Sequence, residues 1–225
     1  MSLSRAARFY EAPIGKKAIM AMTGAILFGF VIVHLIGNLQ IYLPPDANGR
    51  YPIDAYGESL RHLGGLLWAA RLALLASVLV HILAAIQLSI QSNAARPIGY
   101  QKKDNAHSSY ASRTMMWSGP IIGAFIVYHL LHMTGGQLHP QFQDLKVHHN
   151  VVAGFKDPLA SSIYIAAMAM LGMHLYHGLW SMFQSVGVSH PRYTPAIKLF
   201  AKLAAAFLVL GNISIPISVM AGLVK

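Results

Sequence analysis

The sequence lacks cysteine entirely and has few charged residues. Without cysteine the chain can form no disulfide, attach no prosthetic group by a thioether and bind no iron–sulfur cluster through thiolates. Only 11% of its 225 residues are charged, whereas 55% are hydrophobic and the mean hydropathy is +0.49. This is too little charge to cover a soluble globule of this size, so we expect a membrane protein.

Acidic residues are the scarcest charged group. Seven Asp and Glu stand against 17 Lys and Arg, which gives a formal net charge of +10. Membrane topology and anionic lipid account for such a basic balance, so it needs no nucleic-acid partner. We find no internal repeat or low-complexity tract and treat residues 1–225 as a single membrane domain.

Long apolar runs divide the chain into five candidate membrane spans. They cover about 18–41, 66–91, 115–134, 159–183 and 197–222, each near the roughly 20 residues that cross a hydrocarbon core as a helix. The predicted fold is therefore an all-α bundle of five transmembrane helices. Its two termini should lie on opposite sides of the membrane.

The basic residues between the spans predict the orientation. One side collects eleven basic and two acidic residues, Arg5, Arg8, Lys16, Lys17, Arg96, Lys102, Lys103, Arg113, Arg192, Lys198 and Lys202 with Glu11 and Asp104. The other side has six basic residues and five acidic ones. By the positive-inside rule the N-terminus is expected in the cytoplasm and the C-terminus outside.

Each of the first four apolar runs contains histidine, an unusual residue at membrane depth. A neutral imidazole is costly to leave unpaired in hydrocarbon, so four of them call for a partner. His34 and His129 fall in the outer halves of their spans, whereas His81 and His177 fall in the inner halves. Two haems b, each bound by one histidine pair, would satisfy all four and form an electron path across the membrane.

Two of these assignments have an alternative on the same helix face. His132 follows His129 by three residues, and His174 precedes His177 by three, so either member of each pair could bind iron. We prefer His129 and His177 by depth. His132 and His174 are then expected to contact the haem propionates or hydrogen-bond nearby.

Other polar residues near these histidines are candidates for cofactor or quinone contacts. Helical spacing places Thr23 on the face of His34 and Ser77 on that of His81, where hydroxyls could hold the second imidazole nitrogen. The inner-side propionate candidates are Lys17, Arg113 and Trp117, and the quinone candidates are Gln87, Gln91 and Gln184. Interfacial anchors and ordinary helix ends are the alternative interpretation of these residues. The remaining histidines fall in loops and are His62, His107, His139, His148, His149 and His190. We expect them to be solvated, and proton handling near a quinone is the alternative.

Several motifs resemble one known family. They are IGKKAIMAMTG at 14–24 with HLIGN at 34–38, SRTMMWSG at 112–119 with YHLLHMT at 128–134, and HNVVAGFKDP at 149–158 with HLYHGLWSMFQ at 174–184. Together they are similar to the diheme cytochrome b anchor of succinate dehydrogenases and fumarate reductases, over nearly the whole chain. The family pattern of one haem ligand in each of the first four spans falls on His34, His81, His129 and His177.

The resemblance implies a function. The chain would anchor a succinate:quinone oxidoreductase in a bacterial cytoplasmic membrane, in the respiratory chain and the tricarboxylic acid cycle. An iron–sulfur subunit and an FAD flavoprotein would dock on its cytoplasmic face and carry the succinate chemistry, and two haems b would pass electrons to a quinone, menaquinone by the resemblance. The family's menaquinone-site glutamate has only loose counterparts here, Asp54 and Glu58. The oligomeric state of the complex stays open.

Two other classes of function are kept as alternatives. One is the cytochrome b anchor of another quinone-linked dehydrogenase, such as a hydrogenase or formate dehydrogenase. The other is a haem-free membrane protein that moves protons along its histidines. A haem spectrum distinguishes the haem-free protein from the two cytochrome b anchors. A succinate-oxidising partner distinguishes the succinate:quinone oxidoreductase anchor from the other two.

Overall fold

The computed structural model describes residues 8–95 and 110–225, with side chains from residue 113 in the second range. Five long helices dominate the described part: α2 (Pro13–Asn38), α4 (Gly65–Ala94), α5 (Tyr110–His129), α7 (Pro158–Ser185) and α8 (Thr194–Met220). The turns η1 (Leu39–Tyr42) and η2 (Leu130–Thr134) prolong α2 and α5, and the short helices α3 (Pro52–His62) and α6 (Val147–Phe155) lie between long ones. The prediction of an all-helical fold is confirmed for the described residues, and five of the helices are long and apolar enough to span a membrane.

Proline and an N-terminal cap determine where several helices start. Pro13, Pro52 and Pro158 stand in the first turn of α2, α3 and α7, where the missing N–H would have no partner inside the helix. Asp157 caps α7, because its side chain accepts a hydrogen bond of 3.0 Å from the Leu159 amide and so satisfies a free N–H of the first turn. The start of the fourth span at Asp157–Pro158 therefore follows from local sequence.

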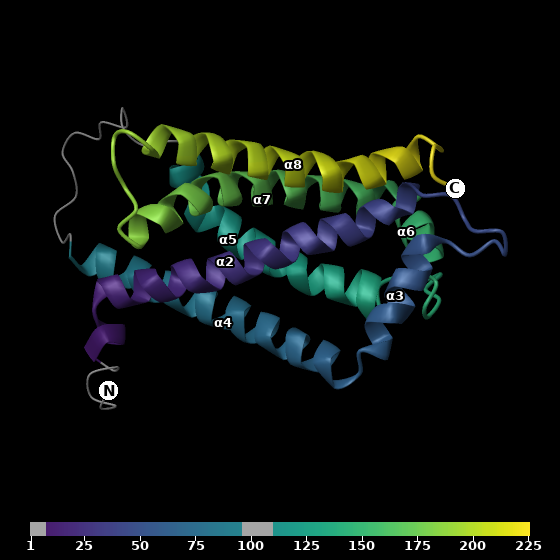
Figure 1. The fold of residues 1–225 in the computed structure, drawn as a ribbon, viewed down its shortest axis with the longest axis horizontal. Helices are drawn as coiled ribbons and strands as arrows, with labels where there is room; N and C mark the ends of the chain where they lie inside the picture. Colours follow the sequence, from purple (N-terminus) through teal and green to yellow (C-terminus); the bar gives the residue numbers. More distant parts are fainter. Residues whose placement is uncertain (1–7, 96–109) are drawn as a thin grey trace.

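The long helices run between two ends of the bundle that differ in character (Figure 1). We call the end that carries α3 and α6 the capped end. The opposite end is called the basic end, and α2, α5 and α8 start there while α4 and α7 finish there (Figure 1). The start of α2 and the end of α8 thus lie at opposite ends of the bundle, as an odd number of crossings requires.

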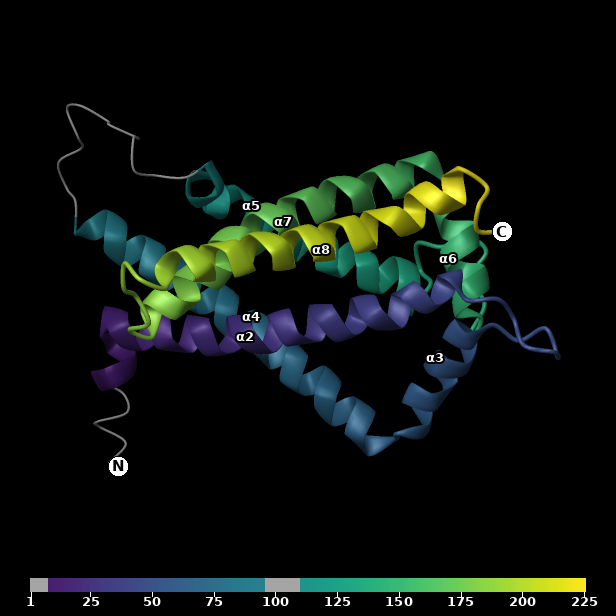
Figure 2. The same ribbon diagram turned by 45° about the horizontal axis from the view of Figure 1, so that its top comes forward.

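Helices α2 and α7 form the centre of the bundle. Helix α2 packs against α4, α7 and α8, and α7 also packs against α5 and α8. Close approach depends on glycine in α7 and α8: a Cβ on Gly172 would lie 2.4 Å from Val209, and one on Gly211 would lie 2.7 Å from Leu35. Small residues at such crossings are typical of helix packing in membranes. Figures 1 and 2 show α4 crossing α2 in the half of the bundle nearer the basic end and diverging from it toward α3.

The capped end holds the main apolar cluster of the described residues. Its buried members are Ile41, Ile53, Val152, Phe155, Tyr164, Ile215, Val219 and Val224. The Asp54 carboxylate of α3 accepts a 2.8 Å hydrogen bond from the His148 amide in the first turn of α6, and Arg61 pairs with Asp144. That guanidinium holds the pKa of the exposed Asp144 carboxyl below its ordinary value. The two short helices are therefore tied to each other and to the bundle.

The middle of the bundle is mostly exposed apolar surface. At most a third of the residues in the most apolar segment of each long helix are buried, and large side chains such as Leu72, Leu79 and Leu210 are more than half exposed. A water-soluble protein rarely exposes so large an apolar area. The chain is accordingly described as a multi-pass membrane protein.

Candidate functional site

His34 of α2 and His129 of α5 face each other toward the capped end. Their ring centroids lie 5.8 Å apart with an interplanar angle of 83°. Phe30 stacks on His34 at 5.4 Å and Phe125 on His129 at 5.9 Å, so aromatic rings support both imidazoles. The structure thus brings together the two histidines that depth had paired, and their role as ligands stays a prediction.

Tyr164 of α7 bridges two histidines beside this pair. Its hydroxyl lies 3.1 Å from Nδ1 of His129 and 3.1 Å from Nδ1 of His132. The ring of His132 stacks at 5.0 Å on His139 and at 5.4 Å on Tyr128. No ring contact joins His132 to His34 among the described residues, so the preference for His129 agrees with the geometry.

A second pair lies nearer the basic end, between α4 and α7. His81 lies opposite His174, with ring centroids 6.3 Å apart and an angle of 59°. Its Nδ1 lies 3.0 Å from the Thr23 hydroxyl of α2, and Nδ1 of His174 lies 3.3 Å from the Ser118 hydroxyl of α5. Four helices therefore contribute to this pair.

Both hydroxyls select the same imidazole tautomer. Thr23 donates its proton to the carbonyls of its own helix, Ile19 at 2.9 Å or Met20 at 3.2 Å, and Ser118 donates to Met115 at 3.3 Å. With these bonds formed, each oxygen is left to accept from the histidine, which would place the imidazole proton on Nδ1. The Nε2 lone pair of each ring is left free to bind a metal, the arrangement that second partners of ligating histidines usually enforce.

The histidine of α7 that faces His81 is His174, whereas the sequence-based argument from depth preferred His177. His177 lies one turn closer to the basic end, where its ring meets Trp180 at 5.2 Å. Its Nδ1 is buried and has no hydrogen-bond partner among the described residues. Three residues separate the two candidates on one helix face, and the contacts of His174 with the His81 ring and the Ser118 hydroxyl distinguish them. The geometry favours His174, the alternative that the sequence left open.

The spacing of each pair is compatible with two imidazoles on opposite sides of one metal. Imidazoles that bind one metal from opposite sides, each at about 2 Å, place their ring centroids roughly 6 Å apart, close to the 5.8 Å and 6.3 Å observed here. No group of three or more His, Cys, Asp or Glu that could hold an ion is found among the described residues. A haem needs only two protein ligands, because the porphyrin supplies the other four.

The pairs occupy different levels of the bundle. Thr23, which contacts His81, and His34 both belong to α2 and are 11 residues apart, which is about three turns or about 16 Å along the helix. Thr23 therefore shares the His34 face of α2, as its spacing predicted, but its partner is His81. Ser77 does not reach either pair: its hydroxyl donates to Ala73 of its own helix at 2.7 Å.

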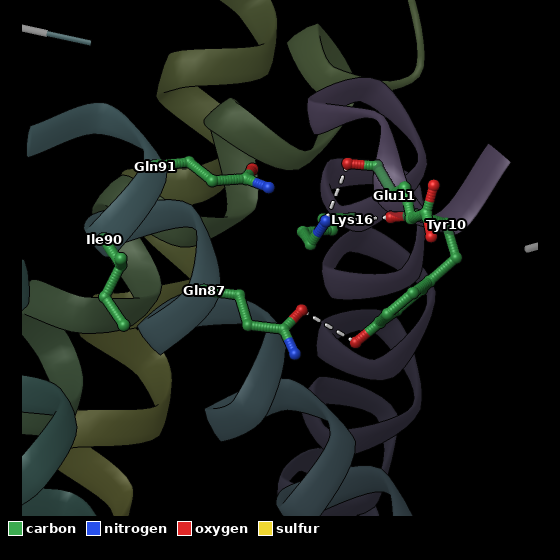
Figure 3. A pocket seen from close by; sticks show the side chains of 6 residues that line it. All are labelled: Tyr10, Glu11, Lys16, Gln87, Ile90 and Gln91. Atoms are coloured by element: carbon green, nitrogen blue, oxygen red, sulfur yellow. Dashed lines mark hydrogen bonds between the residues drawn. The ribbon is translucent and has the colours of Figure 1, made fainter. Parts of the chain in front are cut away.

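A pocket of about 330 Å³ opens at the basic end between α4 and the start of α2. It is lined by Tyr10, Glu11, Lys16, Gln87, Ile90 and Gln91. Figure 3 shows both glutamines pointing from α4 toward Lys16 and Tyr10 across the pocket. The structure thus brings together two of the three glutamines proposed as quinone contacts, whereas Gln184 lies on α7 and does not line this pocket.

The polar groups of this pocket are only partly satisfied. The Tyr10 hydroxyl donates to Gln87 at 2.9 Å, and the Lys16 ammonium donates to the carbonyls of Tyr10 and Glu11 at 3.0 Å and 2.8 Å. Oε1 of Gln91 is buried and has no partner among the described residues. Lys16 is 4% exposed. Sequence reasoning did not propose it for any site and named only its neighbour Lys17, as a haem propionate candidate.

Other predicted site residues either have structural partners at the capped end or are exposed. Asp54 caps α6 through the His148 amide, and Glu58 pairs with Arg50, so both have structural partners at the capped end. Trp117 is 74% exposed, and Lys17 and Arg113 are exposed too. None of these three lines the pocket.

The expectation that the loop histidines are solvated is wrong at two positions. His139 and His148 are 4% and 6% exposed. His139 donates from Nε2 to the Asn150 carbonyl at 2.8 Å and accepts at Nδ1 from the Gln141 amide at 3.2 Å. His148 stacks on Tyr51 with centroids 3.5 Å apart, and its burial lowers the pKa of its imidazole. His107 lies outside the described residues.

We compared the chain with models of known protein families, with curated proteins and with solved structures, and none of the three comparisons found a match.

Proposed function

We propose that this chain is a diheme cytochrome b membrane anchor of a succinate:quinone oxidoreductase. The observation that carries the proposal is the pair of histidine contacts at two levels of the bundle, His34 with His129 and His81 with His174. The motifs that resemble the family connect this arrangement to succinate and quinone. The function is to relay electrons between docked soluble subunits and membrane quinone, in the direction of succinate oxidation or of fumarate reduction.

The chain's own residues would hold two haems b. His34 and His129 bind one, His81 and His174 bind the other, and Thr23 and Ser118 orient the second pair through Nδ1. When bound, haem b supplies a one-electron carrier whose iron has no vacant position for dioxygen or substrate. His177, whose buried Nδ1 has no partner among the described residues, takes the hydrogen-bonding role first expected of His174.

The basic end is the proposed docking face for the partners. Described basic residues near it include Lys16, Lys17, Arg113, Arg192, Lys198 and Lys202, and the positive-inside rule places this end in the cytoplasm. With no cysteine in the chain, iron–sulfur clusters must be carried by another subunit. We therefore assign the succinate chemistry to an iron–sulfur protein and an FAD flavoprotein bound there.

The pocket at the basic end is the proposed quinone site. The Lys16 ammonium uses two of its three protons on backbone carbonyls, and its third can donate to a quinone carbonyl. The unpartnered Oε1 of Gln91 can accept from a quinol hydroxyl. Glu11, an exposed carboxylate at the pocket, can exchange protons with water. A quinone accepts hydrogen bonds at its carbonyls, and the quinol donates them from its hydroxyls. The pocket offers a donor and an acceptor, so it can bind both forms.

A reduced-minus-oxidised spectrum of the purified chain, with haem quantified per polypeptide, tests the proposal. We expect two haems b per chain with low-spin spectra. The absence of haem in a folded, membrane-inserted protein would overturn the proposal. A complex purified with a hydrogenase or formate dehydrogenase subunit in place of the succinate-oxidising pair would replace it with the related anchor function.

A further inference from the structure

We propose that Tyr164 is a positioning residue that makes His129, and not His132, the iron ligand at the pair nearer the capped end. This inference rests on the proposed function, because it concerns how that haem is held. It assigns a role to a hydroxyl that neither the motifs nor the depth of the histidines single out.

The Tyr164 hydroxyl sits between two imidazoles. It lies 3.1 Å from Nδ1 of His129 and 3.1 Å from Nδ1 of His132, and the tyrosine is 8% exposed. A phenol has one proton to donate and lone pairs with which to accept. When it bonds both nitrogens it donates to one and accepts from the other, so the two histidines adopt opposite tautomers.

The surroundings determine which histidine receives the proton. A histidine that donates from Nδ1 has a free lone pair on Nε2 and can bind iron, whereas one that accepts at Nδ1 has its proton on Nε2. His129 faces His34 at 5.8 Å. His132 packs between Tyr128 and His139, and both ring nitrogens of His139 are already hydrogen-bonded. Tyr164 therefore accepts from His129 and donates to His132.

Two phenylalanine rings position the Tyr164 phenol. Phe125 and Phe155 contact the Tyr164 ring edge to face, with centroids 4.9 Å and 4.8 Å away. The regular helix α5 ends at His129, and His132 lies in the π-helical turn η2, a local irregularity that is frequent at functional sites. Thr23 and Ser118 hold His81 and His174 by the same kind of hydroxyl contact.

The decisive variant is Tyr164→Phe in the haem-loaded protein. An acceptor at Nδ1 makes a ligating imidazole more basic and stabilises ferric iron, so its loss should raise the midpoint potential of one haem. We also expect altered low-spin ferric EPR signals for that haem and unchanged values for the other, both measured in a potentiometric titration. Unchanged potentials and EPR signals at both haems would overturn the inference.

Two matched variants make the result specific. Tyr128→Phe removes a neighbouring phenol that also packs on His132 but has no hydrogen bond among the described residues, and it should leave both potentials unchanged. Thr23→Val should shift the haem at His81 and spare the other one. A shift of the same haem in Tyr128→Phe would show that general packing, rather than the Tyr164 hydroxyl, is responsible.

His132→Ala gives an independent test should Tyr164→Phe fail to assemble. Because His132 only accepts from Tyr164, its loss should leave two haems per chain. Loss of one haem in His132→Ala would identify His132 as the ligand and overturn the inference. These outcomes are distinct from failure of the proposed function, which would show as absence of haem in the unaltered protein.

Discussion

The imidazole of His81 lies opposite that of His174, with ring centroids 6.3 Å apart, and Thr23 and Ser118 hold the Nδ1 atoms of the two rings. This contact connects α4 and α7 about three turns of α2 closer to the basic end than His34. Mutation can therefore decide whether His174 or His177 is the iron ligand on α7.

We predict that His174→Ala removes one of the two haems, whereas His177→Ala keeps both. The reason is that His174 alone presents its ring to His81, while His177 meets Trp180. Haem per chain, measured after purification of each variant, checks the prediction. His81→Ala serves as the reference for loss of the same haem, and retention of two haems in His174→Ala with loss in His177→Ala would restore the preference drawn from depth.

His34→Ala and His129→Ala should each remove the other haem. The two rings face each other at 5.8 Å from α2 and α5, so loss of either leaves iron with one protein ligand. The remaining haem should keep its potential, because the pairs are about 16 Å apart along α2. The variants are checked by redox titration. Loss of both haems in either variant would contradict two separate haem sites.

Gln91→Leu should weaken quinone binding at the basic-end pocket. The change removes the buried Oε1 that has no partner among the described residues, and the loss of one hydrogen bond to a ligand, about 0.5–1.5 kcal/mol, corresponds to a roughly 2- to 12-fold rise in KM. Gln184→Leu is the matched control, since Gln184 is exposed and does not line the pocket. Equal KM values for both variants in the assembled complex would place the quinone elsewhere.

The stability of the capped end should fall in mild acid. Burial lowers the pKa of His148 below 6.5, an effect that the Asp54 carboxylate partly opposes. The unfolded chain then binds a proton at His148 more readily than the folded one. The contribution of neutral His148 to the free energy of unfolding is therefore complete above pH 6.5 and is lost as the pH falls below that value. His148→Phe, which can still stack on Tyr51, should show a shallower fall in thermal midpoint between pH 7 and pH 5, about the range in which histidine titrates. A fall as steep as that of the unaltered protein would assign the acid sensitivity to other groups.

The chain purified alone should accept electrons from dithionite but oxidise no succinate. It has no cysteine for a cluster and no flavin or nucleotide motif, so dehydrogenation requires the soluble partners. Adding the iron–sulfur and flavoprotein subunits should let succinate reduce its haems, followed spectroscopically. Haems that stay oxidised in an assembled complex that passes electrons to quinone would confine this chain to anchoring.

The sequence by itself determined the five spans, the start of α7 at Pro158 and the level of each histidine along its helix. These properties are local: apolar length, a capping aspartate and a rise of about 1.5 Å per residue act within one segment. Depth along the helices was therefore enough to predict that His34 and His129 lie at the same level.

Only the tertiary structure decided between neighbours on one helix face. His174 and His177 differ by three residues, so the packing of α7 against α2 and α5, and of α4 against α2, determines which one meets His81. The same applies to Lys16, which is buried where its neighbour Lys17 is exposed, and to Tyr164, whose partners lie 32 and 35 residues away in the chain. Helical periodicity gives the face of a residue relative to its neighbours, but the packing of other helices decides what that face contacts.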